Sequence, residues 1–435
     1  MKIKLIKNGA IVFPDKKQPL KGDIYLEGDK IKRIDLESDR GKKAKGKATF
    51  KKDEVIDATG MLVLPGLIDM HVHLREPGRE DCETIATGTM AAAAGGFTAV
   101  ACMPNTLPPL DNQESVLFVK QRASGCKARV YPIGAVSRGR AGKELADIGE
   151  MVKTGAVAIT DDGSPVSDAG MMRRALEYAG MFGICVISHA EDMSLSGKGI
   201  MNEGYESTRL GMHGIPPFSE EVCIARDLLL CKYIGTPVHI AHVSTKGAVE
   251  LIRQAKADGV NVTAEVTPHH FTLTDAEIGK GFNTNLKMNP PLRTQEDVEA
   301  IIDGLKDGTI DCIASDHAPH APEDKEVEFD QAPNGIIGLE TSLGLVATHL
   351  VKPGHLSWNQ VAAKMAANPA RILRTVGGDL RAGAVADITI VNPKANWTVK
   401  VDKFLSKSRN SPYDGWKLQG KVRWTILGGE VSYEG

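Results

Sequence analysis

Residues 62–73 read LVLPGLIDMHVH, an apolar run that ends in two histidines spaced two residues apart. Seven more short runs rich in Val, Ile and Ala follow along the chain: FTAVACM (97–103), ARVYPIGAV (128–136), GAVAITDD (155–162), GICVISHA (183–190), PVHIAHVS (237–244), NVTAEVTPHH (261–270) and IDCIASDHAPH (310–320). Runs that are apolar along their whole length are typical of parallel strands covered by helices. The sequence therefore predicts an α/β fold, a closed (β/α)₈ TIM barrel, with an open doubly wound sheet as the alternative.

Helices are predicted in the stretches that separate these runs. The clearest candidates cover residues 84–94, 169–178, 220–233 and 246–257. Gly95 and Gly96 follow the Ala-rich end of the first candidate, and a glycine pair at that place is typical of a helix stop. Strand and helix therefore alternate repeatedly along the middle of the chain.

Both ends of the chain read as β-structure. The strand-like stretches there are KIKLIKNGAIV (2–12), DIYLEGDKIKRIDL (23–36), ADITIVNP (386–393) and VRWTILGGEVSYE (422–434). We expect residues 1–60 and 380–435 to form one small composite β-domain, a β-sandwich, beside a barrel of residues 61–379. The lysine-rich residues 40–52 are expected to form a solvated loop between strands, with a nucleic-acid patch as the less favoured interpretation.

The composition is that of an ordinary soluble globular protein, with 42% hydrophobic and 25% charged residues among 435. A balance of 53 basic against 55 acidic residues gives no reason to expect nucleic acid or an anionic membrane as partner. No apolar stretch approaches the roughly 18 residues of a membrane span, and the N-terminus lacks the apolar core of a signal peptide. The seven scattered cysteines include no CxxC pair. They predict buried free thiols in a reducing compartment, so a cytoplasmic location is expected.

Ionisable side chains gather at the ends of the predicted strands, the rim where barrel enzymes keep their sites. They are His71, His73, Asp161, Asp162, His189, His242 and Asp316. Residues two apart on a strand face the same side, so His71 and His73 can point together, whereas only one of Asp161 and Asp162 can point inward. Burying so many ionisable groups together without a cation would be costly, so the set predicts a metal site. Imidazole with carboxylate suits Zn²⁺, with Mn²⁺, Co²⁺ and Fe²⁺ as alternatives, and the number of ligands favours a bridged pair of ions.

Such a site predicts hydrolytic chemistry. A water held between two cations loses a proton near neutral pH and becomes a nucleophile. Asp316, at the same rim, is placed to take that proton and pass it to a leaving group. Arg75, two residues beyond His73, can grip a carboxylate in bidentate fashion, with a rim salt bridge as the alternative. Glu76 beside it is interpreted either as the partner of Arg75 or as a solvated residue.

Two further features have weaker functional interpretations. His269 and His270 are adjacent, so at most one faces inward, and structural roles are favoured for them. Residues 321–333 carry many charges and no apolar periodicity, which indicates a mobile loop. We hypothesise that this loop acts as a lid.

Nine motifs carry a resemblance to a known family: GLIDMHVHLREPG, ACMPNT, ITDDGSPV, SHAED, HIAHVST, AEVTPHH, KMNPPLR, ASDHAPH and NGIIGLET. Together they resemble the amidohydrolase superfamily and, within it, the bacterial class I dihydroorotases. The resemblance covers about residues 60–387, including the closing GDLRAGAVADITIV. The HxH element is shared across the superfamily, whereas HLREPG with MPNT, DDG and NPPLR is far more specific.

The resemblance implies a zinc-dependent enzyme that reversibly cyclises N-carbamoyl-L-aspartate to L-dihydroorotate in pyrimidine biosynthesis. One or two Zn²⁺ ions are implied, with two favoured. The implied ligands are His71 and His73 for the first ion and His189 and His242 for the second, with Asp162 bridging them and Asp316 completing the first site as general acid/base. The implied substrate-binding residues are His73, Arg75, Asn105, Asn289, His320, Asn334 and Gly335.

Two alternatives remain open. Hydantoinases and allantoinases typically carry a carboxylated lysine on the fourth strand, but that strand reads VAITDDG here, and the nearest lysine, Lys153, lies upstream in the preceding helix. The second alternative is a catalytically silent paralogue that acts as a scaffold subunit. A homo-oligomer is expected, and the family resemblance also implies association with aspartate transcarbamoylase as a possibility.

Overall fold

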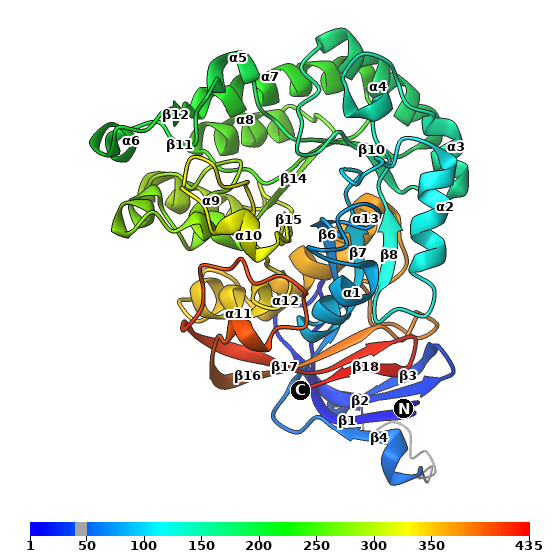
Figure 1. Cartoon of the computed structure of the whole chain (residues 1–435). Coiled ribbons are helices and arrows are strands. Elements are labelled where there is room, and N and C mark those ends of the chain that lie inside the picture. Colours follow the sequence, from blue (N-terminus) through cyan, green and yellow to red (C-terminus); the bar gives the residue numbers. More distant parts are fainter. Residues whose placement is uncertain (40–49) are drawn as a thin grey trace.

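The computed structural model describes residues 1–39 and 50–435, and the chain folds as an α/β protein (Figure 1). The lysine-rich residues 40–49 lie outside the described residues, so the solvated loop predicted for residues 40–52 stays a prediction for that part. None of the helices in the described ranges has the length and apolar character needed to cross a membrane.

Parallel strands form two sheets in the main body. One sheet contains β6 (Leu67–Val72), β7 (Phe97–Cys102) and β8 (Arg129–Pro132). The other contains β9 (Ala158–Ile159), β10 (Cys185–Ser188), β13 (Val238–Ile240), β14 (Val262–Val266) and β15 (Cys312–Ile313). Two isolated parallel bridges, between Gly134 and Ile159 and between Val72 and His317, connect the edges of these sheets. Each of the eight apolar runs therefore contributes one strand to these two sheets.

Helices separate these strands, as the sequence predicts. The α-helices are α1 (Ile85–Ala94), α2 (Gln113–Arg122), α3 (Ile148–Thr154), α4 (Ala169–Phe182), α5 (Met193–Ser196), α6 (Tyr205–Leu210), α7 (Pro217–Ile234), α8 (Lys246–Ala257), α9 (Gln295–Asp307), α10 (Pro322–Lys325), α11 (Ser342–Val346), α12 (Trp358–Ala362) and α13 (Asn368–Leu373). Short 3₁₀ turns are η1 (Glu37–Asp39), η2 (Lys52–Glu54), η3 (Arg138–Arg140), η4 (Pro268–Phe271), η5 (Asp275–Lys280), η6 (Thr284–Leu286) and η9 (Val401–Lys403), and π turns are η7 (Ala347–Val351) and η8 (Ala363–Ala367). A short parallel pair, β11 (Met201–Asn202) and β12 (Gly214–Ile215), lies outside the two main sheets.

The helix ends follow from capping residues. Helix α8 has the predicted bounds, and α1 begins one residue later than predicted because Thr84 is its N-cap and accepts a hydrogen bond from the backbone N–H of Thr87. Helix α4 continues past the predicted end to Phe182, where Gly183 takes a left-handed conformation with φ of 67°. Helix α7 begins earlier than predicted, at Pro217, because proline is well tolerated in the first turn.

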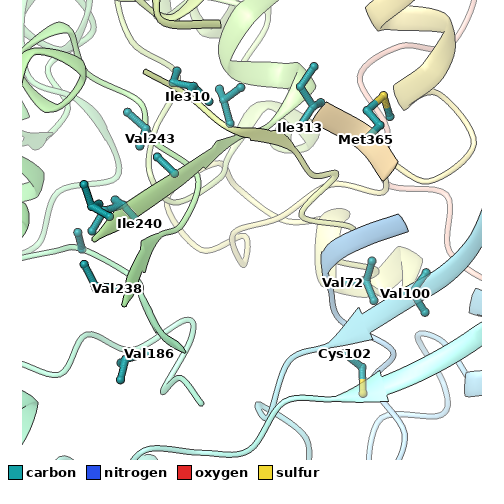
Figure 2. Close-up of a cluster of buried hydrophobic side chains, with 14 of the residues drawn as sticks. Val72, Val100, Cys102, Val186, Val238, Ile240, Val243, Ile310, Ile313 and Met365 are labelled. Atoms are coloured by element: carbon teal, nitrogen blue, oxygen red, sulfur yellow. The ribbon is translucent and has the colours of Figure 1, made fainter. Parts of the chain in front are cut away.

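Alternate residues along the strands pack into two different clusters. A large cluster between strands and helices includes Val100, Cys102, Val186, Val238 and Ile240 (Figure 2). The residues between them in sequence belong to a second cluster that contains Ala101, Cys185, Ile187 and Ala241. Because side chains alternate between the two faces of a strand, both faces of these strands are buried, which explains why the runs are apolar throughout. All seven cysteines are free and all except Cys126 are buried, as the sequence predicts.

Strands from both chain ends share one mixed sheet, drawn in blue and red at the bottom of Figure 1. Its order is β18-β17-β16-β5-β1-β2-β3, with β4 paired to β1. The strands are β1 (Leu5–Ile11), β2 (Leu20–Glu27), β3 (Lys30–Leu36), β4 (Val55–Asp57), β5 (Leu62–Pro65), β16 (Ile388–Thr398), β17 (Lys417–Leu427) and β18 (Glu430–Glu434). The run at residues 62–73 is thus divided: its first part joins this sheet, and only β6 belongs to the parallel strands. The division into domains at residues 61 and 379, and the β-sandwich, stay predictions.

Candidate active site

The six residues that the family resemblance implies as metal ligands lie at the carboxyl ends of parallel strands. His71 and His73 stand at the end of β6, Asp162 follows β9, His189 follows β10, His242 follows β13 and Asp316 follows β15. All six side chains are buried. The fold therefore brings together residues that lie up to 245 positions apart in the sequence, at the strand ends where α/β enzymes place their sites.

Asp162 stands between two groups of possible metal ligands. His71, His73 and Asp162 form one triad, and Asp162, His189 and His242 form the other, with the ligand atoms of each triad within 4.8 Å of one another. Asp162 Oδ1 lies 3.4 Å from both His71 Nε2 and His189 Nδ1, and Oδ2 lies 3.5 Å from His73 Nε2. Asp162 is therefore shared by the two triads.

The electrostatics of the two triads fit a cation. His71 Nε2 and Asp162 Oδ1 are buried and have no hydrogen-bond partner among the described residues. Burial alone would raise the pKa of Asp162, but the imidazoles of His71, His189 and His242 hold it well below its usual range. An ionised carboxylate among imidazoles is the donor set of a divalent transition metal, and unpaired buried polar atoms are rare in native proteins unless an ion or water satisfies them. The residues present therefore fit a metal site.

Asp161, the neighbour of Asp162, points away from the triads. Its Oδ1 accepts hydrogen bonds from the backbone N–H groups of Val136 at 2.9 Å and Ser137 at 3.0 Å, and its Oδ2 accepts one from the Ser137 hydroxyl. These hydrogen bonds occupy the Asp161 carboxylate, and Asp162 is the one of the two adjacent carboxylates that faces the histidines.

Asp316 lies beside the first triad. Its Oδ1 is 3.0 Å from His73 Nε2 and 3.5 Å from His71 Nε2. Burial would raise the pKa of Asp316, but the neighbouring His71 and His73 lower it below its usual value, so the group is a carboxylate able to accept a proton. Its φ of 48° is uncommon for a residue with a side chain, and such conformations cluster at functional sites.

Glu265 of β14 is a site residue that the sequence reasoning missed. Its Oε1 lies 2.6 Å from His71 Nδ1, and its Oε2 lies 3.3 Å from His239 Nε2. Burial would raise the pKa of Glu265, but the two histidines lower it to about 2. The carboxylate therefore accepts the N–H at Nδ1 of His71 and leaves the Nε2 lone pair for a metal. The signal in the sequence was a single carboxylate inside an apolar strand.

We expect Glu265→Gln to weaken metal binding by about 10–100-fold, because the amide is a weaker acceptor for the His71 N–H and no longer holds that ring in one tautomer. Metal titration of the metal-free protein measures the change. The control is Asp387→Asn, which also removes a buried carboxylate charge, but at the ion pair with Arg129, away from the histidines. Equal affinity in Glu265→Gln and the unmodified chain would contradict the role of Glu265.

Three of the predicted substrate-binding residues meet beside Asp316. Arg75 Nε donates a hydrogen bond to the Pro319 carbonyl at 2.9 Å, and its Nη2 lies 3.5 Å from His320 Nε2. His320 Nε2 donates to the Asn334 carbonyl at 2.8 Å. Burial, together with the charge of Arg75, lowers the pKa of His320 to about 3, so this ring is neutral at pH 7.

The other predicted substrate-binding residues lie around the two triads. Asn105 Oδ1 is 2.7 Å from His73 Nδ1, and Asn289 Nδ2 donates to Glu191 Oε2 at 2.8 Å. Asn289 and Asn334 both line a cavity of about 610 Å³, together with Glu191. Gly335 follows Asn334 in a left-handed conformation with φ of 127°. The structure thus brings all of the predicted substrate-binding residues to the surroundings of the triads.

Both interpretations of Glu76 are wrong. The side chain is buried, its Oε1 accepts a hydrogen bond from Arg122 Nε at 2.6 Å, and its Oε2 accepts one from the backbone N–H of Ile85 at 2.8 Å. Glu76 therefore satisfies the first turn of α1 and does not pair with Arg75.

His270 and residues 321–333 have contacts that bear on their predictions. His270 Nδ1 lies 2.7 Å from Thr267 Oγ1 and Nε2 donates to the Pro290 carbonyl at 3.1 Å, which are structural contacts. Residues 321–333 contain α10, and the buried Lys325 Nζ donates to the Thr284 and Pro333 carbonyls. Movement of this loop as a lid stays a prediction.

Comparison with known proteins agrees with this geometry. Residues 60–248 match the family model described as Dihydro-orotase-like. The dihydroorotase of Pelotomaculum thermopropionicum is 54% identical over 98% of this chain and 97% of its own length, and that of Geobacter metallireducens is 51% identical over 99% of both. Among solved structures, the L-hydantoinase of Arthrobacter aurescens has a TM-score of 0.87 and 27% identity over 100% of this chain and 96% of that one. A dihydropyrimidinase of Brevibacillus agri, at 24% identity over 99% of this chain and 95% of that one, has a TM-score of 0.84 and shows the same fold.

Both of these relatives, which match over nearly their full length, are named dihydroorotase. The residues that converge at the strand ends belong to the sequence motifs that resemble the same family. The chain belongs to the dihydroorotase family of metal-dependent cyclic amidohydrolases.

Proposed function

We propose that this chain is an active, zinc-dependent dihydroorotase that interconverts L-dihydroorotate and N-carbamoyl-L-aspartate. The observation that carries the proposal is the pair of metal-ligand triads that share Asp162, with Arg75 and Asp316 beside them. Relatives at about 50% identity over nearly the whole chain bear the name dihydroorotase, which supports the assignment of the substrate.

We also infer that the strands β6 to β10 and β13 to β15 close into a (β/α)₈ barrel and that two Zn²⁺ ions occupy its mouth. The isolated bridges at Gly134–Ile159 and Val72–His317 support closure, because they join the two parallel sheets at both edges. The sharing of Asp162 between two triads supports two ions. His71, His73 and Asp316 would hold the first, and His189 and His242 the second.

In this proposal the guanidinium of Arg75 binds the carboxylate of the substrate. The Arg75 side chain is partly buried, and its Nε donates a hydrogen bond to the Pro319 carbonyl at 2.9 Å, which leaves donors at the two terminal nitrogens. A planar guanidinium matches a carboxylate in bidentate fashion. The neutral His320 and the amides of Asn105 and Asn289 supply uncharged hydrogen-bonding groups for the ring, and Gly335 lets the backbone approach it closely.

Asp316 carries the proton in the proposed reaction. Bound zinc ions supply Lewis-acid activation of water and of the scissile carbonyl. In ring opening, Asp316 accepts a proton from the attacking water and donates it to the leaving ring nitrogen, and in cyclisation it makes the reverse transfers. Its position 3.0 Å from His73 Nε2 keeps the carboxylate at the first triad, where water attacks.

Hydantoinase activity is the main alternative, because the solved structures with this fold include hydantoinases. The contacts argue against it. Lys153, the nearest lysine to the fourth strand, lies at the end of α3, where its exposed Nζ donates to Glu150 at 2.8 Å and does not reach the triads. Hydantoins also lack the carboxylate that Arg75 is placed to bind.

The test is a substrate panel on the purified, zinc-supplemented chain alone, comparing L-dihydroorotate, hydantoin, dihydrouracil and allantoin by ring absorbance or product formation. We expect selective opening of dihydroorotate, because only that ring carries a carboxylate for Arg75. Faster opening of a neutral ring would contradict the proposal and favour the hydantoinase alternative. Inactivity on all four rings would contradict autonomous activity and favour a scaffold role, and adding aspartate transcarbamoylase then tests for a required partner. Association with that enzyme, or with a second copy of this chain, stays a prediction.

A further inference from the structure

The segment between η9 and β17 returns from the mixed sheet to the active site, and Asn410 is its central residue there. Asn410 is only 4% exposed. Its side-chain Oδ1 accepts a hydrogen bond from the backbone N–H of His320 at 3.1 Å, and its Nδ2 donates to the carbonyls of Ala318 at 3.0 Å and Gly335 at 3.1 Å. Its own backbone carbonyl accepts from the N–H of Ile337 at 3.0 Å. One residue therefore links two loops with four hydrogen bonds.

These two loops carry substrate-binding residues of the proposed reaction. The first loop, residues 318–320, begins two residues after Asp316 and contains His320. The second loop, residues 334–337, contains Asn334 and Gly335. They also touch directly, because His320 Nε2 donates to the Asn334 carbonyl at 2.8 Å and a Cβ on Gly335 would lie 2.6 Å from Ala318 Cβ. The backbone N–H of Ala318 also donates to the Ile336 carbonyl at 2.8 Å, so the amide of Asn410 adds bonds to both sides of an existing contact between the two loops.

The segment that carries Asn410 is itself fixed to the main body. The Ser408 hydroxyl lies 2.7 Å from the Cys82 carbonyl and 2.8 Å from the His320 carbonyl. The backbone N–H of Lys407 donates to Glu83 Oε1 at 3.1 Å, and the Ser406 hydroxyl donates to the same buried carboxylate. Asn410 therefore presents its amide from a rigid support.

The three hydrogen bonds of the Asn410 side chain require an amide group. A primary amide offers an acceptor and two donors in one plane, and here the N–H of His320 and the two carbonyls use all of these atoms. A carboxylate of the same shape would place an oxygen against the carbonyls of Ala318 and Gly335. Alanine would remove this partner from the partly buried His320 N–H and from the buried carbonyls of Ala318 and Gly335, and an unpaired buried polar group carries a desolvation cost.

We propose that Asn410 is a positioning residue that sets the arrangement of the substrate-binding loops 318–320 and 334–337. This inference rests on the proposed function, because the loops matter through the contacts that His320, Asn334 and Gly335 make with dihydroorotate. Asn410 acts through these residues and does not touch the substrate. Its removal weakens substrate binding and leaves the proton transfer at Asp316 in place.

The test compares Asn410→Ala and Asn410→Asp with the unmodified full-length, zinc-loaded chain in steady-state kinetics on L-dihydroorotate. We expect KM to rise about tenfold or more while kcat changes by less than about threefold, the pattern of a lost uniform binding interaction. Zinc content should stay unchanged, because neither loop contributes a residue to the triads. The matched control is Asn359→Ala, which removes another buried asparagine whose Nδ2 donates to the Phe13 carbonyl at 2.7 Å, far from the site in the fold. It should lower Tm and leave KM unchanged.

An unchanged KM in both Asn410 variants would overturn the inference, as would an equal rise of KM in Asn359→Ala. Hydrogen exchange of the unmodified chain tests the geometry independently of any variant: slow exchange of the His320 and Ile337 amides supports it, and rapid exchange of both overturns it. Absence of dihydroorotate turnover in the unmodified chain would refute the proposed function instead, while the exchange measurement would still report on Asn410.

Discussion

Replacing Asp316 with Asn should lower kcat for dihydroorotate by about 10³-fold, within the range of general acid–base catalysis. The amide keeps the shape of the side chain and can still contact His73, but it cannot accept a proton from water or return one to the ring nitrogen. The four imidazoles and Asp162 remain in place, so the bound metal should be retained. Steady-state kinetics and metal analysis of the same preparation measure both quantities.

The control for this change is Asp311→Asn, just before β15, the strand that leads to Asp316. Asp311 Oδ2 accepts hydrogen bonds from Lys256 Nζ at 2.6 Å and from the Ala264 backbone N–H at 2.9 Å, so the variant alters a structural carboxylate that the reaction does not use. We expect it to keep nearly full kcat. Substantial turnover by Asp316→Asn would refute the acid/base role, and loss of its metal would show that Asp316 acts chiefly as a ligand.

The sequence predicted well those features that depend only on residues close to one another along the chain. Each apolar run contains one parallel strand because burial of both strand faces requires apolar residues throughout. His71 and His73 share a direction because they lie two residues apart on one strand. Helix α1 ends at the predicted place because Gly95 and Gly96 follow it. Alternation alone left Asp161 and Asp162 equivalent. The family resemblance implied Asp162, and the hydrogen bonds of Asp161 to Val136 and Ser137 agree with that choice.

The features that the sequence did not predict depend on contacts between distant segments. Glu265 meets His71 across 194 residues, and Asn410 meets Ala318 and Gly335 across 92 and 75. Because both partners are distant in sequence, neither the carboxylate in AEVTPHH nor the single amide of Asn410 indicates which residues it contacts. Glu76 was misassigned for the same reason, since its partner Arg122 lies 46 residues away on α2.

Asp162→Asn should remove metal binding together with turnover, with kcat lower by at least about three orders of magnitude, because the activation of water depends on the ions. Asn is neutral and has one oxygen in place of two equivalent ones, so it cannot bridge the two triads as a carboxylate can. Its amide nitrogen would also face imidazoles that surround Asp162 at 3.4–3.5 Å. We therefore expect a larger loss than Glu265→Gln causes, since Glu265 contacts only one ligand.

Asp161→Asn is the matched control, since it makes the same chemical change at the adjacent residue. Its oxygen can still accept from the N–H groups of Val136 and Ser137, so metal content and kcat should stay near those of the unmodified chain. Thermal unfolding gives a readout that does not depend on catalysis: an ion that binds only the folded state raises stability by about 2.7 kcal/mol at a hundred times its Kd. Added zinc should therefore raise the Tm of the metal-free unmodified chain and of Asp161→Asn, but not that of Asp162→Asn. Equal zinc-induced shifts in the two variants would show that Asp162 does not join the triads.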